Sequence, residues 1–283
     1  MNVMEAVPQI QAQPREPHWL WRTLRTIAIV YLGVLLLLLF LENKLLYHPW
    51  KDSDGWAPPP LSLHAEDVWL PLADGTKVHA WWCPVPGARG AVLYAHGNAG
   101  NLSHRGQAAQ KLQEGLGLSV LIFDYPGFGK SEGKVSEAGC YAATHAAYDW
   151  LAQQVPSEQI VLYGKSLGGG VMTELAVQKP HRALVLVKSF TSVPDMAQKQ
   201  FPFLPARWLV RNQFNNLARI PQCPRPIFIA HGDCDSLIPL DHSRRLYAAA
   251  PEPKQFLLMP GCDHNDALPV AFYLKLAEFL GKN

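Results

Sequence analysis

The sequence predicts an α/β fold, in which a mostly parallel central sheet has helices on both faces, preceded by one N-terminal transmembrane helix. Two observations support this prediction. From residue 67 onward, short apolar runs typical of buried strands alternate with longer stretches typical of helices. Near the N-terminus, residues 26–41 form a run of 16 residues without a charged side chain. We therefore expect an α/β domain tethered to a membrane.

The composition suits one large globular core. The chain has 283 residues, of which 48% are hydrophobic, and α/β folds of this size often form a single domain. The net charge of +2, from 25 basic and 23 acidic residues, is nearly balanced, and no basic stripe or nucleic-acid motif occurs. The five cysteines contain no C-x-x-C pair; they lie at positions 83, 140, 223, 234 and 262. We therefore expect no nucleic-acid partner, no zinc or other metal site and no cofactor.

The expected elements of the α/β domain follow one another in regular order. A β-hairpin comes first, with two strands joined by an Asp74-Gly75 turn. Buried strands and helices then alternate, which is the pattern of a mostly parallel sheet, and ligands of such sheets bind at the carboxyl ends of the strands. The strands are expected at 67–72, 77–83, 91–95, 119–124, 160–163, 183–187, 227–230 and 255–259, and helices at 102–114, 136–154, 171–178 and 269–280.

The charge-free run at residues 26–41 is predicted to cross a membrane. At about 1.5 Å per residue it spans roughly 24 Å, slightly less than a hydrocarbon core of about 30 Å, so Arg25 and Lys44 are expected to extend to the headgroups. No small-residue cleavage site follows Leu41, which favours an uncleaved anchor over the alternative, a cleaved signal peptide. Three arginines precede the run and two lysines follow it closely. The positive-inside rule then predicts a cytoplasmic N-terminus and an extracytoplasmic α/β domain.

These predictions divide the chain into four parts. Residues 1–25 form an N-terminal tail, residues 26–47 the transmembrane anchor, residues 48–66 a linker and residues 67–283 the α/β domain. The linker contains three consecutive prolines and is expected to be stiff.

A nucleophile is predicted at Ser166. Residues 164–168 read G-K-S-L-G, a G-x-S-x-G sequence that lies between a predicted strand and a predicted helix. Such a turn strains the serine backbone, and the two glycines remove Cβ atoms that would collide there. The serine hydroxyl then lies at the N-terminus of a helix, whose dipole favours negative charge. Five-residue patterns also arise by chance, so this interpretation needs a base, an acid and an oxyanion hole elsewhere in the chain.

Candidates for the acid and the base follow two later strands. Asp235 and His264 each lie in a loop directly after a predicted strand, so the chain order is serine, acid, histidine. Asp233 is the alternative acid, although the spacing of Asp235 is more typical. His231 is expected to brace its loop. A metal site made from these residues is less expected, because a serine elbow gives such a metal no evident role.

An oxyanion hole needs two backbone N–H groups that point at the oxygen on which negative charge develops. Leu167, directly after the nucleophile, is expected to supply one of them. The other is expected from the loop after the strand at 91–95, where Gly97 and Gly100 let the backbone approach a substrate. Asn98 is the first choice for this donor, and Ala99 is the second.

Four segments together resemble a known family. They read H-G-N-A-G-N at 96–101, D-Y-P-G-F-G-K-S-E-G at 124–133, G-K-S-L-G-G at 164–169 and H-N-D at 264–266. In combination they are similar to the membrane-anchored α/β-hydrolases of the domain-containing-protein-13 type. The resemblance extends from about Leu45 to the C-terminus. It implies the α/β-hydrolase fold and a serine hydrolase with Ser166, Asp235 and His264 as its catalytic triad.

We expect a membrane-anchored serine hydrolase that cleaves ester or thioester bonds of lipid-like or acyl substrates. Relatives with a similar core include protein depalmitoylases, but the cysteine-rich N-terminus of those enzymes is absent here. Hydrolysis of amides or peptides remains an alternative, as does a catalytically silent scaffold at the membrane.

Two further hypotheses concern the surroundings of the site. Residues 192–225 are rich in large apolar side chains and prolines, so they form either an apolar cap that binds an acyl chain or a segment packed on the core of the domain. Cys234 and Cys262 lie one residue from Asp235 and two residues from His264. If the two loops are neighbours and the domain lies outside the cytoplasm, a disulfide between the two cysteines is a further hypothesis.

Overall fold

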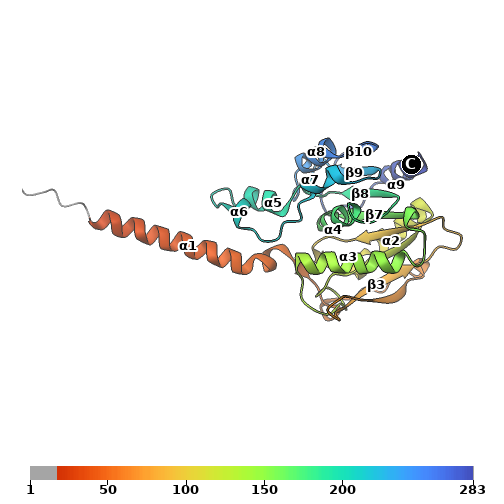
Figure 1. Ribbon diagram of the computed structural model, residues 1–283, viewed down its shortest axis with the longest axis horizontal. Helices are drawn as coiled ribbons and strands as arrows, with labels where there is room; N and C mark the ends of the chain where they lie inside the picture. Colours follow the sequence, from red (N-terminus) through yellow and green to blue (C-terminus); the bar gives the residue numbers. More distant parts are fainter. Residues whose placement is uncertain (1–17, 283) are drawn as a thin grey trace, which may run out of the picture. The chain divides into compact units, whose positions relative to one another are not determined.

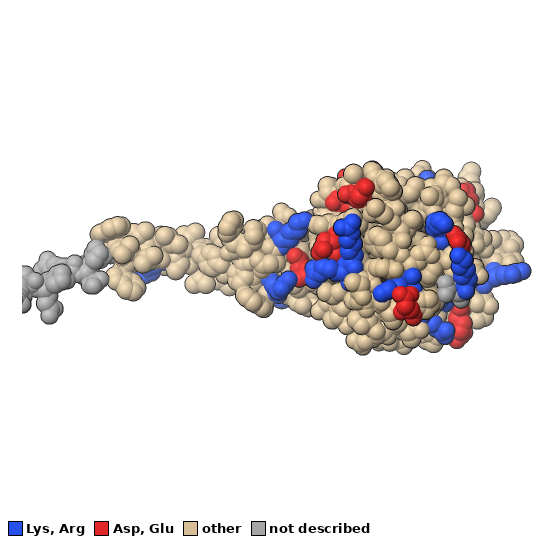
Figure 2. Space-filling view, turned by 90° about the horizontal axis from the view of Figure 1, so that it is seen from above, with Lys and Arg blue, Asp and Glu red and all other residues tan. Residues whose placement is uncertain are grey.

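The computed structural model describes residues 18–282, and the chain divides into two compact units after Leu41. The N-terminal unit contains most of helix α1 (His18–Leu46), which is orange in Figure 1. This helix is long and apolar enough to cross a membrane, and Figure 2 shows few charged side chains along it. A signal sequence near an N-terminus meets the same requirement, so the helix is a candidate span.

Helix α1 begins earlier than residue 26, where the anchor was predicted to begin. The prediction placed the start of the anchor at the start of the charge-free run, directly after Arg25. Arginine is a good helix former, however, so the helix continues through it toward the N-terminus. The other part of the predicted tail, residues 1–17, lies outside the described residues.

The second unit is built on an eight-stranded sheet in the order β10-β9-β8-β7-β4-β6-β3-β2 (Figure 1). The pairs β2–β3 and β3–β6 are antiparallel, and the other neighbouring strands are parallel. The predicted α/β fold with a mostly parallel sheet is therefore confirmed. The strands are β2 (Glu66–Pro71), β3 (Lys77–Cys83), β4 (Ala91–Ala95), β6 (Ser119–Phe123), β7 (Ile160–Lys165), β8 (Ala183–Val187), β9 (Ile227–Gly232) and β10 (Lys254–Met259).

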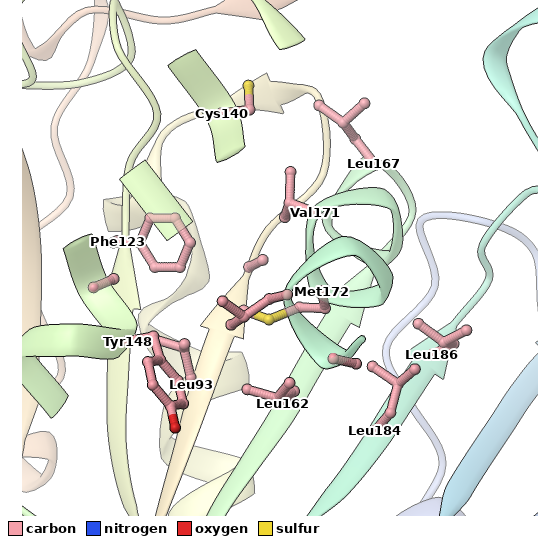
Figure 3. Close-up of a cluster of buried hydrophobic side chains, with 14 of the residues drawn as sticks. Leu93, Phe123, Cys140, Tyr148, Leu162, Leu167, Val171, Met172, Leu184 and Leu186 are labelled. Atoms are coloured by element: carbon pink, nitrogen blue, oxygen red, sulfur yellow. The ribbon is translucent and has the colours of Figure 1, made fainter. Parts of the chain in front are cut away.

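Two hydrophobic cores lie on opposite faces of this sheet. On β4, Leu93 points into one core while its neighbours Val92 and Tyr94 point into the other, because successive side chains alternate along a strand. Figure 3 shows Leu93 and Leu162 of the sheet beside Met172 of α4. Helices α3 (Glu137–Leu151), α4 (Leu167–Ala176) and α8 (Leu240–Ala249) cover the first face, and α2 (Gly106–Leu116) and α9 (Val270–Lys282) cover the second.

Most predicted elements occur within a few residues of their expected bounds, and α8 is the main omission. This helix begins directly after Pro239, and its buried side chains are Leu246 and the polar pair His242 and Ser243. A helix that buries polar residues has no clear apolar periodicity, so the sequence pattern does not reveal it.

Residues 48–66, the predicted linker, pack onto the domain. The short strand β1 (His48–Pro49) pairs in parallel with β5 (Ala99–Gly100), which lies in the loop expected to supply the oxyanion donor. Leu63 is fully buried, and Tyr47, the residue just before this segment, is buried too and donates a hydrogen bond of 2.7 Å to the Asn212 side chain. The prolines predicted a stiff spacer, but the apolar side chain of Leu63 and the backbone of β1 find partners on the domain.

The segment at 192–225 has two kinds of surroundings. Its short helices are α5 (Val193–Gln200), α6 (Ala206–Leu209) and α7 (Asn216–Arg219). Phe214 and Ile220 are fully buried in the first core, as expected if the segment packs on the domain. In contrast, Phe203 is 92% exposed and Trp208 is 83% exposed. The part of the segment around α6 therefore presents large apolar side chains to its surroundings.

Candidate active site

Ser166 lies in a sharp turn between β7 and α4. Its backbone has φ 56° and ψ −119°, a left-handed conformation that non-glycine residues rarely adopt. Its N–H donates to the carbonyl of Val187 on the neighbouring strand at 2.9 Å. A methyl group at Gly164 would overlap the carbonyl of Gly168, and a methyl group at Gly168 would overlap the carbonyl of Ala95. The two glycines therefore permit the close packing of helix on sheet that holds Ser166 in this conformation.

The structure brings Ser166, His264 and Asp235 together. The Ser166 Oγ and His264 Nε2 atoms are 3.2 Å apart, and His264 Nδ1 is 2.8 Å from Asp235 Oδ2. Ser166 is 6% exposed and His264 is 5% exposed, so the pair is nearly closed to bulk water. This is the geometry in which a histidine accepts a proton from a serine while a carboxylate orients the ring.

Several donors surround the carboxylate of Asp235. Its Oδ1 atom accepts from the N–H groups of Leu237 at 3.0 Å and Ile238 at 2.7 Å. Its Oδ2 atom lies 3.3 Å from Nε2 of the buried His231, in addition to its contact with His264. Burial by itself raises the pKa of Asp235, but the hydrogen bonds from His231, His264 and Ile238 together hold that pKa well below its usual range. The side chain therefore stays ionised.

Asp233, the alternative acid, lies elsewhere. Its side chain is exposed, and its Oδ1 atom accepts from the N–H of Gly261 at 2.7 Å. It thus orders the loop that leads to His264, while Asp235 alone of the two contacts the imidazole. The choice of Asp235 over Asp233 agrees with this geometry.

The loop after β4 lies beside the nucleophile. A Cβ atom at Gly97 would lie 3.5 Å from Cβ and 3.9 Å from Oγ of Ser166. In the described part of the chain, no other protein group accepts a hydrogen bond from the N–H groups of Asn98 and Leu167. The side chain of Asn98 is used differently: its amide donates to the carbonyl of Leu46 at 2.6 Å. The N–H groups of both expected oxyanion donors thus make no hydrogen bond within the described part of the chain.

A buried polar network holds the loop after β4 in place. Asp124 Oδ1 lies 3.0 Å from His96 Nε2 and accepts from the N–H of Leu102 at 2.8 Å. The Tyr125 hydroxyl donates to the carbonyl of His96 at 2.7 Å. His96 and Asp124 are fully buried, so their role is to order the loop, which is the role expected for His96.

Two residues near the site were not predicted from the sequence. Ser189 Oγ donates to the carbonyl of Ser166 at 3.2 Å, and the ammonium group of Lys188 lies against the loop that contains His264. A usable signal exists for Lys188, because it directly follows the continuous apolar strand A-L-V-L-V at 183–187. A lysine at the carboxyl end of a buried strand is rarely buried unless it has partners.

The disulfide hypothesised between Cys234 and Cys262 is absent, because both thiols are free. The loops are neighbours, but the two side chains differ in their surroundings. Cys234 is exposed, whereas Cys262 is half-buried and its backbone and Cβ lie against Gly232. Within residues 18–282, no group of three or more His, Cys, Asp or Glu side chains has the arrangement of a metal site.

Comparisons with known proteins give relatives over most of the chain. Residues 90–211 match the family described as alpha/beta hydrolase fold. An uncharacterized protein of Mycobacterium tuberculosis is 39% identical over 254 residues, which cover 87% of this chain and 89% of that protein. The alpha/beta hydrolase domain-containing protein WAV2 of Arabidopsis thaliana is 34% identical over 245 residues, or 78% and 79% of the two chains. Among solved structures, the esterase Pf2001 of Pyrococcus furiosus has the same fold, with a TM-score of 0.67 and 22% identity over 84% of this chain and 97% of that one.

The lowered pKa of Asp235 predicts a pH-dependent contribution to stability. Because the folded state prefers the ionised carboxylate, this contribution is present above the unfolded pKa of about 3.9 and is lost as the pH falls through the lower folded pKa. The variant Asp235→Asn lacks it. We expect the thermal midpoint of wild type to exceed that of Asp235→Asn at pH 7, and the gap to shrink below about pH 4.

The matched control for this measurement is Asp233→Asn, which removes the exposed carboxylate two residues away. It should keep the pH dependence of the wild type. A gap between wild type and Asp235→Asn that stays constant from pH 7 to pH 3 would contradict the prediction.

Proposed function

Because this chain belongs to the α/β-hydrolase family, as its four motifs predicted, we propose that it is a membrane-anchored serine hydrolase that cleaves ester or thioester bonds. The single observation that supports this proposal most is the hydrogen-bonded series of Ser166, His264 and Asp235, with contacts of 3.2 Å and 2.8 Å. The three residues come from loops after β7, β10 and β9, so chance proximity of neighbours in sequence does not explain their meeting.

The proposed reaction begins with Ser166. As its Oγ atom attacks the acyl carbonyl, the Nε2 atom of His264 takes the hydroxyl proton. Asp235 holds the ring so that Nδ1 carries a proton and Nε2 presents its lone pair. The imidazolium then donates its proton to the leaving alcohol or thiol, an acyl-enzyme remains on Ser166, and water releases the acid by the same route.

The N–H groups of Leu167 and Asn98 are proposed to bind the oxyanion that forms during both steps. Two donors of this kind lower the barrier substantially, since loss of one typically costs about 3–4 kcal/mol. The position of Asn98 depends on the end of α1 and the residues directly after it: the N–H of His48 donates to the Asn98 carbonyl at 2.8 Å, and the Asn98 side-chain amide donates to the carbonyl of Leu46. The segment next to the proposed anchor thus holds one side of the oxyanion site.

Lipid-like acyl substrates are favoured for two reasons. Helix α1 is proposed to anchor the chain, with the N-terminus in the cytoplasm and the hydrolase unit outside it. Phe203 and Trp208 are exposed on the segment that contains α6, and aromatic side chains of this kind suit a membrane interface or an acyl chain.

The esterase from Pyrococcus furiosus has the same fold, which is in keeping with ester chemistry.

The nucleophile can be tested by covalent labelling. We expect the full-length protein to react with a fluorophosphonate probe and the Ser166→Ala variant not to react, because the probe bonds only to an activated serine. The exposed Ser62 serves as the control, and Ser62→Ala should label like wild type. Wild-type protein that is folded but shows no Ser166-dependent labelling would refute the proposed hydrolase and favour a catalytically silent protein.

The identity of the acid can be tested by hydrolysis of a short p-nitrophenyl ester. Asp235→Asn should lower kcat by about 10⁴, as expected when an amide replaces the carboxylate that holds the catalytic histidine in its correct tautomer. Asp233→Asn should cause a much smaller loss, because Asp233 does not contact His264. Equal losses in the two variants would refute the assignment.

The preference for acyl chains can be tested with p-nitrophenyl esters from acetyl to decanoyl. If the chain is buried on binding, kcat/KM should rise by up to about fourfold per CH₂, which corresponds to ~0.8 kcal/mol. The double variant Phe203→Ser/Trp208→Ser should weaken this rise. The control double variant, Leu61→Ser/Val270→Ser, alters two apolar residues that are also exposed and should not weaken it. Indifference of wild type to chain length would remove the support for lipid-like substrates.

A further inference from the structure

Lys188 occupies an unusual place at the carboxyl end of β8. It is completely buried, and its backbone φ is 49°, in the left-handed region that favours glycine. Ser166 follows the adjacent strand β7 and has φ 56°. Two neighbouring parallel strands therefore end in strained non-glycine residues, one of which is the proposed nucleophile. Strain of this kind persists where the surrounding structure or a function requires that side chain.

The ammonium group of Lys188 binds the main chain of the loop that contains His264. It donates to the carbonyl oxygens of Asp263, of His264 at 3.2 Å and of Asp266 at 3.3 Å. An ammonium group has three N–H donors, so three converging carbonyls satisfy it completely. Burial lowers the pKa of Lys188, and nearby carboxylates, those of Asp235 and Asp266 among them, oppose this effect.

The order of the strands explains why this loop needs support. His264 follows β10, at the edge of the sheet, whereas Ser166 follows β7. The loop after β10 must therefore reach past the ends of β9 and β8 to bring the imidazole to the serine. The Asp263 side chain ties the loop to the one after β9, since it accepts from Ser236 N–H at 2.7 Å and from His264 N–H at 2.7 Å. Lys188 ties it to β8, the strand next to the nucleophile.

We propose that Lys188 is a positioning residue, whose buried ammonium group fixes the backbone at 263–266 so that His264 stays within hydrogen-bond distance of Ser166. This inference rests on the proposed hydrolase function and assigns Lys188 no contact with substrate. Removal of the ammonium group leaves the three carbonyls without their donor, and the loop then shifts. A misplacement of about 1 Å can slow a positioned reaction by about 100-fold.

The test compares Lys188→Met with Lys254→Met in the full-length protein. Lys254 is a matched control, because its ammonium group also donates to backbone carbonyls, those of Tyr247 at 2.9 Å and Ala250 at 2.7 Å, at the end of α8. Turnover of a short p-nitrophenyl ester is measured per active serine, counted by fluorophosphonate titration. We expect Lys188→Met to lower kcat by about 10- to 100-fold with KM nearly unchanged, and Lys254→Met to change the thermal midpoint only.

A second variant, Lys188→Gln, keeps an N–H donor on a shorter, uncharged side chain and should give an intermediate kcat. The proposal is overturned if kcat per active serine in Lys188→Met equals that in Lys254→Met, or if both Lys188 variants fail to fold, since the role is then purely structural. These outcomes differ from failure of the proposed function, in which wild type itself shows no Ser166-dependent labelling.

Discussion

The close packing of α4 against β7 and β4 is the constraint on which the candidate site depends. Gly164 and Gly168 leave no room for a Cβ atom, and their packing forces Ser166 into its left-handed conformation at the end of β7. The same turn places the Leu167 N–H at the start of α4 and puts Gly97 next to the serine. One helix–sheet contact thus sets both the proposed nucleophile and the loop proposed to bind the oxyanion.

Around this turn, polar groups that are inaccessible to solvent hold the loops of the site. His96 and Asp124 order the loop after β4, His231 and two backbone N–H groups hold the carboxylate of Asp235, and Lys188 holds the loop of His264. The side chains of His96, His231 and Lys188 are fully buried and hydrogen-bonded, as buried polar groups must be if they are not to destabilise the fold. Precision in the site therefore depends on residues that need not touch a substrate.

The chain between the apolar helix and the sheet links the tether to the site. Residues expected to form a stiff linker instead add a short strand to β5, and the carbonyl of Leu46, the last residue of α1, accepts a hydrogen bond from the side chain of Asn98. If α1 is a membrane anchor, as proposed, the end of the anchor and one side of the oxyanion site share a set of hydrogen bonds. A variant that truncates the chain near Leu46 would alter both.

The sequence by itself determined the alternation of strands and helices, the G-x-S-x-G turn and the order of Ser166, Asp235 and His264, because strand periodicity and glycine requirements are local properties. It also revealed the apolar helix. The tertiary structure decided which of Asp233 and Asp235 meets the imidazole, that Cys234 and Cys262 remain free thiols, and that residues 48–66 pack on the domain. It also revealed Lys188, since its partners follow it by more than 70 positions in the chain. Contacts between residues so far apart in sequence depend on the order of the strands in the sheet. Local sequence patterns do not predict that order.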